Sequence, residues 1–205
     1  WTTAFTAGAD GTSYDSLAPV IRLGQLDALS GPLLLNIPKS AGTTIDEANL
    51  ILDYCANRGD MFAIFDTPDS SLSSVFEDAT YGINKITSAN LKYGASYYPQ
   101  LKITDPAATV DARTRTIPPG GAVCAIILNT DSQRGVSKAP AGRDASISGI
   151  IDVSATIFSD DLAAIATNER ALNLIRYLPE IGKYSIMGAR TLSPYLNERY
   201  IKIGR

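Results

Sequence analysis

The segment Asp69-Ser70-Ser71-Leu72-Ser73 places one carboxylate and three hydroxyl groups shortly after the apolar run 61–65. In this spacing, Asp69, Ser71 and Ser73 could hold a magnesium ion, because Mg²⁺ prefers oxygen ligands. The same residue types are also typical of a helix start, where their side chains accept hydrogen bonds from free backbone N–H groups. The capping interpretation is favoured, since the sequence offers no obvious second acidic loop to complete a metal site. A metal-dependent adhesion-type binding module stays open as an alternative.

A second chemical possibility is a carboxylate pair, because Asp60, Asp66 and Asp69 flank one short apolar run. Paired carboxylates can perform acid–base or glycosidic chemistry. Aspartates at the ends of a strand more often form caps or turns, so a carboxylate-based α/β enzyme is the weaker alternative. The chain has no histidine, and therefore lacks the usual general base and the commonest metal ligand. Its glycine clusters match neither the P-loop nor the dinucleotide fingerprint. These absences argue against an enzyme, without excluding one that uses carboxylates or lysine.

The elements around these aspartates have the pattern of a βαβ unit. Residues 33–37 and 61–65 are apolar runs of strand length. Between them, Thr44 and Glu47 have the spacing of a capping box, and Gly59 is a typical helix stop. A crossover of this kind joins parallel strands. The prediction is an α/β fold with a mixed sheet, a βαβ core and flanking helices.

The rest of the chain is predicted from the same kinds of signal. Alternating apolar and polar residues over 89–103 indicate a long strand with one wet face, in which Tyr98 points away from Tyr93 and Tyr97 and could mark a contact surface. The other predicted elements are a short helix near Leu17, a helix over 72–86, a hairpin or excursion over 104–117, a helix over 122–128 opened by two prolines, a surface loop over 132–149, a helix capped by Ser159, and strands over 172–177, 185–187 and 200–203. The expected organisation is a loop-rich entry over 1–30, the βαβ core over 31–103, and a completing part over 104–205.

Composition excludes several classes of protein. A length of 205 residues with 45% hydrophobic and 19% charged residues predicts one globular domain rather than a disordered chain. The apolar runs are too short to cross a bilayer, so we expect no membrane insertion. Basic residues are scattered and the net charge is −3, which argues against a nucleic-acid partner. Cys55 and Cys124 are interpreted as small buried hydrophobes, with a disulfide as the alternative.

Several segments, taken in chain order, resemble the contractile tail sheath proteins of myophages and related injection machines. They are residues 58–66, 95–99 and 118–123, Asp131 with 134–136, residues 138–142 and 172–176, and the pair formed by 188–192 and 199–203. Each segment by itself is a weak signal, but the order and spacing of all the segments make the resemblance specific. Members of this family often carry tryptophan where this chain has Gln100, Ser137, Met187 and Glu198, which indicates a divergent member. The chain begins at Trp1 and stops soon after the last segment, so we expect a core piece without the terminal arms of the family.

The resemblance implies a structural subunit rather than an enzyme. Sheath subunits stack as six-fold rings around a tail tube above a baseplate, and their terminal arms add strands to neighbouring sheets. Contraction drives the tube through the host envelope and needs no cofactor or nucleotide. The implied location is the virion tail, assembled in the cytoplasm of the host bacterium, and a bacteriocin or another injection device remains an open alternative. We take Tyr98, Arg190 and Arg199 as candidates for subunit contacts, and expect the chain by itself to be a monomer.

Overall fold

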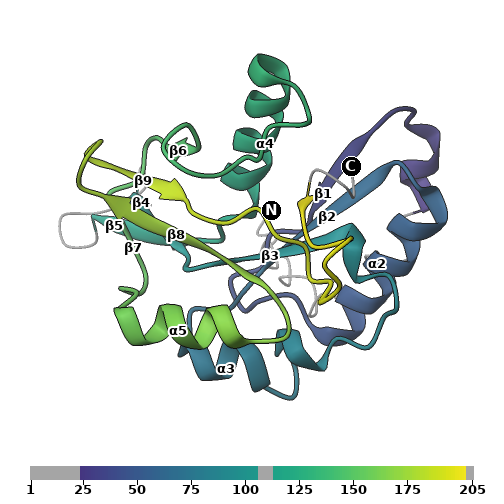
Figure 1. The fold of residues 1–205 in the computed structure, drawn as a ribbon, viewed down its shortest axis with the longest axis horizontal. Coiled ribbons are helices and arrows are strands. Elements are labelled where there is room, and N and C mark those ends of the chain that lie inside the picture. The colour runs from purple at the N-terminus through teal and green to yellow at the C-terminus, as the bar shows by residue number, and fades with distance from the viewer. Residues whose placement is uncertain (1–23, 106–112, 202–205) are drawn as a thin grey trace, which may run out of the picture.

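The computed structural model describes residues 24–105 and 113–201, and its centre is a six-stranded sheet with helices on both faces (Figure 1). The strand order is β1-β2-β3-β8-β9-β6. A separate three-stranded sheet has the order β5-β4-β7. The short 3₁₀ helix η1 (Gly24–Ala28) precedes the first strand. Within the described residues, none of the helices combines the length and the apolar composition that a membrane span requires.

The predicted βαβ unit is confirmed. Strands β1 (Leu33–Asn36) and β2 (Met61–Asp66) are parallel and are joined through helix α2 (Ile45–Arg58). The Thr44 hydroxyl accepts from the Glu47 backbone N–H at 3.4 Å, and a Glu47 carboxylate oxygen accepts from the Thr44 N–H at 3.1 Å. Gly59 ends the helix in the left-handed region at a φ of 77°, which glycine adopts at little cost.

The main sheet is mixed, as the sequence predicts. Strands β3 (Gly94–Tyr98) and β8 (Leu172–Leu178) continue the parallel part beside β2. Strands β9 (Lys183–Ile186) and β6 (Ser146–Ile147) then add antiparallel pairs. The four parallel strands therefore present their carboxyl ends along one edge of the sheet.

Two hydrophobic cores lie on opposite faces of this sheet. The first packs α2, α3 and α5 against one face, through residues that include Leu52, Val75 and Ile165. The second packs α4 against the other face, through Val123 and Ile127. Figure 1 shows α3 and α5 side by side below the sheet and α4 above it. Cys55 belongs to the first core and Cys124 borders the second, so the sheet separates the two thiols and both are free. Burial raises the pKa of Cys55 to about 12 and that of Cys124 to about 11.

The single helix predicted over residues 72–86 is wrong. Helix α3 (Leu72–Glu77) ends after six residues, and the 3₁₀ turn η2 (Ile83–Lys85) follows separately. Asp78 adopts an extended backbone, and its carboxylate accepts from the Thr80 N–H at 2.7 Å. This local side-chain bond competes with continuation of the helix.

The long strand predicted over residues 89–103 is also wrong. A 3₁₀ turn η3 (Leu91–Tyr93) precedes β3, and the chain then leaves the main sheet at Pro99, which has no N–H to donate to a ladder. Strand β4 (Leu101–Thr104) pairs instead with β5 (Thr114–Ile117) and β7 (Asp152–Val153). All five residues of β3 are buried, so the expected wet face does not exist. The antiparallel pair β4–β5 confirms the hairpin, although residues 106–112 lie outside the described part.

Three smaller predictions need adjustment. Helix α4 (Gly120–Arg134) begins at the expected prolines but continues into the segment predicted as loop. Helix α5 (Ser159–Thr167) is capped at Phe158 rather than Ser159, and Asp161 accepts from the Phe158 N–H at 2.8 Å. The last predicted strand is represented by one bridge between Arg190 and Tyr200, while residues 202–203 lie outside the described residues, as does the helix near Leu17.

The capping box of α2 leads to a prediction about pH. Burial disfavours ionisation of Glu47, but hydrogen bonds from Lys39 and Thr44 outweigh it and hold its pKa below the ordinary value of 4.5. Glu47→Gln is therefore expected to lower the free energy of unfolding by about 1–3 kcal/mol at pH 7. A carboxylate with a depressed pKa loses its stabilising contribution as the pH falls through its folded-state pKa, so the difference in the free energy of unfolding should be smaller in acid than at pH 7.

Urea unfolding at pH 7 and pH 3 measures this difference. Asp46→Asn is the matched control, because Asp46 is exposed in the same first turn of α2 and its loss should change stability by only a few tenths of a kcal/mol. If Glu47→Gln lowered the free energy of unfolding equally at both pH values, the expected role of the ionised carboxylate would be contradicted.

Candidate functional site

The carboxyl edge of the parallel strands is the usual ligand-binding place in an α/β sheet, and here it holds a buried aspartate. Asp66 ends β2 and is 2% exposed. Its carboxylate accepts from the Gly120 N–H at 2.8 Å, the Asn36 side-chain amide at 3.1 Å and the Lys39 N–H at 3.4 Å. Burial raises the pKa of Asp66, and these three hydrogen bonds partly offset the increase. The carboxylate thus fastens the start of α4 to β1 and β2.

Gly120 fits closely into this arrangement. A Cβ atom at Gly120 would lie 2.1 Å from the Asn36 amide nitrogen, which is closer than real contacts allow. Only glycine therefore lets the first N–H of α4 reach Asp66 while Asn36 also donates to it. The helix dipole places positive charge next to the carboxylate, so the interaction anchors α4 in addition to satisfying hydrogen bonds.

The structure does not bring Asp60, Asp66 and Asp69 together. Asp60 precedes β2 and pairs with Arg58, whose Nε donates to Asp60 Oδ1 at 2.8 Å and whose Nη2 donates to Oδ2 at 3.0 Å. Asp66 is at the other end of this six-residue strand, roughly 20 Å away at about 3.3 Å per residue. The weaker alternative, a carboxylate pair formed by Asp60 and Asp66 across this strand, is therefore excluded.

The serine pattern has a capping role. Ser71 is the N-cap of α3, and its hydroxyl accepts from the Ser74 N–H at 3.3 Å and contacts the Ser74 hydroxyl at 3.0 Å. Asp69 and Ser73 are exposed on either side. Among residues 24–105 and 113–201, no three His, Cys, Asp or Glu side chains lie close enough to hold a metal ion. Of Asp69, Ser71 and Ser73, Ser71 has the capping role that the sequence favoured.

Tyr98 is not accessible to a neighbouring subunit. It is 2% exposed, because β3 is a central strand covered on both faces. Its hydroxyl donates to the Ser70 carbonyl at 3.0 Å, and burial raises its pKa, with further increases from the charges of Asp69 and Asp161. The prediction of Tyr98 as a contact residue is wrong, and Arg190 and Arg199 remain as candidates.

Both arginines belong to the C-terminal segment, residues 188–201, which is fastened by Asn173 of β8. The Asn173 side chain accepts from the Arg190 N–H at 2.8 Å and donates to the Arg190 carbonyl at 2.8 Å. It also donates to the Ser96 carbonyl of β3 at 3.2 Å. A Cβ atom at Gly188 would lie 2.5 Å from the Asn173 amide oxygen, so glycine permits this close approach. The role of Asn173 depends on contacts between distant segments and was not predicted from the sequence.

Further bonds close the C-terminal segment on itself and on the sheet. The Leu192 N–H donates to the Gly94 carbonyl at 2.9 Å, and the Thr191 N–H donates to the Arg199 carbonyl at 2.8 Å. The Ile201 N–H donates to the Ala189 carbonyl at 3.1 Å. Leu192 and Ile201 are fully buried. The segment is therefore a rigid base from which its exposed side chains project.

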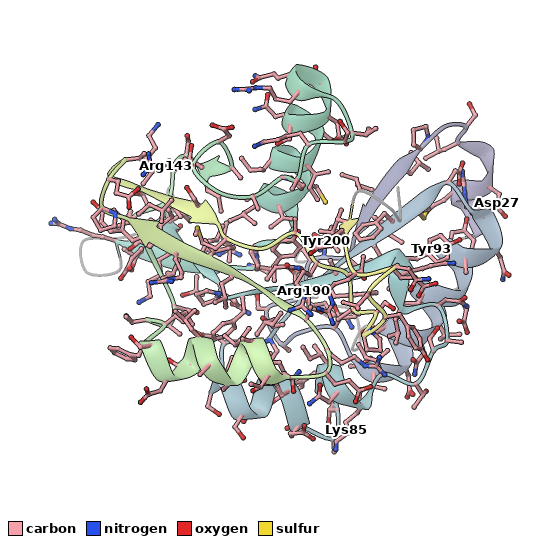
Figure 2. The ribbon with its side chains drawn as sticks, in the orientation of Figure 1. Asp27, Lys85, Tyr93, Arg143, Arg190 and Tyr200 are labelled. Atoms are coloured by element: carbon pink, nitrogen blue, oxygen red, sulfur yellow. The ribbon has the colours of Figure 1, made fainter. Side chains whose placement is uncertain are left out.

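Arg190 and Arg199 are held close together on this base, and neither forms a salt bridge within the described residues. The Nε of each is buried without an acceptor. The Nη2 atom of Arg199 donates to the Pro194 carbonyl at 3.2 Å. Burial lowers the pKa of Arg190, and the charge of Arg199 lowers it further. Figure 2 shows Arg190 and Tyr200 next to each other in the middle of the molecule.

Exposed apolar side chains accompany the two arginines. Tyr195 is 67% exposed, Leu196 75% and Tyr200 49%. We call Arg190, Tyr195, Leu196, Arg199 and Tyr200 the C-terminal patch. Aromatic residues and arginine are enriched at protein interfaces, so this composition favours a protein partner. Tyr195 and Leu196 were not predicted from the sequence, although an apolar pair between Pro194 and Asn197 in a turn is a signal that could have indicated them.

No protein-family model matches the chain, and no curated protein sequence matches it. Solved structures do match. A chain of the PVC sheath complex of an extracellular contractile injection system, in the contracted state, has a TM-score of 0.69 and 26% identity over 90% of this chain. The helical sheath of the anti-feeding prophage in the contracted state has a TM-score of 0.65 and 24% identity over 92% of this chain. A chain of the six-fold symmetrised baseplate of that prophage has a TM-score of 0.64 and 22% identity over 93%.

This chain spans about half the length of the chains it matches, 46% to 47% in these three structures. The matches cover about nine-tenths of this chain. The likeness to sheath proteins, first indicated by short segments, therefore extends over most of the chain. The chain therefore shares its fold with sheath chains of contractile injection systems.

Proposed function

We propose that this chain is the core of a structural subunit of a contractile sheath, which surrounds a tail tube and contracts to drive the tube through a cell envelope. The observation that carries the proposal is the match to a sheath complex in the contracted state, with a TM-score of 0.69 over 90% of this chain. The subunit's partners would be further copies of itself in stacked six-fold rings, a tube protein and a baseplate. Its place would be the tail of a virion or of a related injection device, assembled in bacterial cytoplasm.

The contacts of the aspartates support a mechanical role. Asp66 is used to fasten α4 to the sheet, Asp60 is paired with Arg58, and the Ser71 hydroxyl caps α3. These polar groups hold elements in fixed relative positions. A subunit that moves during contraction as a near-rigid body needs such anchoring, because its contacts with neighbours change while its own fold does not. We propose accordingly that the protein is not an enzyme.

Electron microscopy of the complete gene product that contains this chain tests the proposal. We expect tubes or rings, because sheath subunits polymerise through repeated contacts with copies of themselves. Monodisperse monomers of the complete product at all protein and salt concentrations would overturn the proposal. The 205-residue chain alone should sediment as a monomer, since it spans only about half of the matched sheath chains. A stable hexamer of the chain alone would contradict this second expectation.

A further inference from the structure

We propose that Arg190 and Arg199 form a carboxylate-binding site that is filled, in the assembled protein, by the acidic patch of a second copy of this chain. The acidic patch consists of Asp69, Asp160 and Asp161. The inference rests on the proposed sheath function and names the contact that the subunit would make through this part of its surface.

The arginine pair lacks the partners that its chemistry requires. Two guanidinium groups are held near each other and are partly withdrawn from water, but no carboxylate lies within 4.0 Å of either among the described residues. Their buried Nε groups have no acceptor, and an unmet buried donor is costly. A carboxylate would accept from the fork of guanidinium N–H groups in the bidentate geometry that favours arginine. It would also neutralise the repulsion between the two cations.

The pair is organised before a partner arrives. Asn173 fixes the backbone of Arg190 by two hydrogen bonds of 2.8 Å, and the Thr191 N–H fixes the carbonyl of Arg199. Backbone that is already ordered loses little entropy on binding, so more of the interaction energy appears as affinity.

The acidic patch lies where α3 and α5 begin. Asp69 precedes α3, and Asp160 and Asp161 are in the first turn of α5. Helices α3 and α5 pack on the same face of the sheet and lie side by side in Figure 1, so these carboxylates belong to neighbouring elements. None of the three forms a salt bridge within residues 24–105 and 113–201. The acidic patch is therefore a concentration of negative charge with the sign opposite to that of the arginine pair.

Apolar groups border both patches. Phe158 is 68% exposed immediately before α5, next to Asp160. Tyr195 and Leu196 are exposed directly after Pro194, whose carbonyl accepts from Arg199. Apolar contacts around a charged centre exclude water and strengthen the interaction that they surround. The two surfaces are thus opposite in charge, and each has exposed apolar side chains close by in the sequence.

The relative position of the patches suits a repeating assembly. In Figure 1, α3 and α5 lie along the lower side, while the C-terminal segment, in yellow, crosses the middle of the view. The patches are different surfaces of one molecule, so a contact between them is heterologous. Heterologous contacts repeat from subunit to subunit and generate rings or helices.

The test uses tube formation by the complete gene product, measured by sedimentation and electron microscopy. Arg190→Glu with Arg199→Glu should reduce the polymer at least tenfold, and adding Asp69→Arg and Asp160→Arg in the same chain should restore it. Asp161 is left unchanged, because it caps α5. Arg113→Glu with Arg115→Glu is the matched control, since both arginines are exposed and form no salt bridge in the described part of the chain. This control should polymerise normally.

The outcomes distinguish a failure of the proposed sheath function from a failure of the proposed contact between the arginine pair and the acidic patch. Absence of tubes from the unmodified protein would overturn the sheath function and this inference together. Normal tubes from the Arg190→Glu, Arg199→Glu variant would overturn the inference alone. Loss of tubes without rescue by the reversed acidic residues would show that the acidic patch is not the occupant. Circular dichroism and thermal melting of the 205-residue chain check folding. If the glutamate variant does not fold, Arg190→Gln with Arg199→Gln replaces it, and normal tubes from that variant would equally overturn the inference.

Discussion

Asp66→Ala is expected to lower the free energy of unfolding by about 2–4 kcal/mol, because it leaves buried donors without an acceptor. The Gly120 N–H loses its partner at 2.8 Å, and the Lys39 N–H loses one at 3.4 Å. The Asn36 side-chain amide also loses its bond to Asp66 but keeps its bond to the Ile64 carbonyl at 3.0 Å, so it contributes less to the destabilisation. For a domain of this size the change corresponds to a melting temperature lower by roughly 5–15 °C. Differential scanning calorimetry or urea unfolding measures the effect.

The same variant has a predicted pH dependence. Because burial raises the pKa of Asp66, the folded state keeps its proton to a higher pH than the unfolded state does. The stabilising contribution of Asp66 is therefore largest at low pH and decreases as the pH rises through the raised pKa. The free energy of unfolding that is lost in Asp66→Ala should therefore be larger at pH 4 than at pH 7.

Asp69→Ala provides the control for Asp66, since Asp69 is exposed three residues further along the chain. It should change the stability of the isolated chain by less than about 0.5 kcal/mol. Equal effects of the two substitutions would contradict the anchoring role assigned to Asp66.

Asn173→Ala is the second substitution with a large expected effect. It removes three hydrogen bonds made by a side chain that is 1% exposed, two to Arg190 and one to the Ser96 carbonyl. We expect a loss of about 2–4 kcal/mol, because the Arg190 N–H and carbonyl are left beside a small cavity. The loss should be concentrated in the C-terminal segment, which Asn173 joins to β3 and β8.

Hydrogen exchange distinguishes this local effect from general destabilisation. Amides of residues 189–192 should exchange faster in Asn173→Ala, while amides of β2 should keep a higher protection. Asn197→Ala is the control, because Asn197 is exposed in the same segment and should leave exchange unchanged. Uniformly increased exchange over β2 and the C-terminal segment would show that Asn173 does not act as a local clamp.

The parts of the fold that were predicted correctly depend on short-range signals. The capping box of Thr44 and Glu47, the stop at Gly59 and the apolar runs of β1 and β2 are each defined within a few residues. Local hydrogen bonding and burial decide such elements, so their sequence patterns are sufficient. The mixed α/β architecture followed from their order.

The incorrect predictions concern choices that depend on distant partners. Alternation over residues 89–103 could not reveal that the chain changes sheets at Pro99, because β3 gains its partners from β2 and β8, and β4 from β5 and β7. For the same reason Tyr98 was assigned to a surface although both faces of β3 are covered.

The sequence by itself determined the βαβ unit, the mixed sheet and the likeness to contractile sheath proteins, since these are carried by local patterns in a set order. Only the tertiary structure decided how the charged groups are used. It buried Asp66 beneath the start of α4, separated it from Asp60, and brought Arg190 and Arg199 together on a base held by Asn173. The reason is physical: whether a charge is paired, buried or left for a partner depends on groups that packing brings near it, and these lie far away in the sequence.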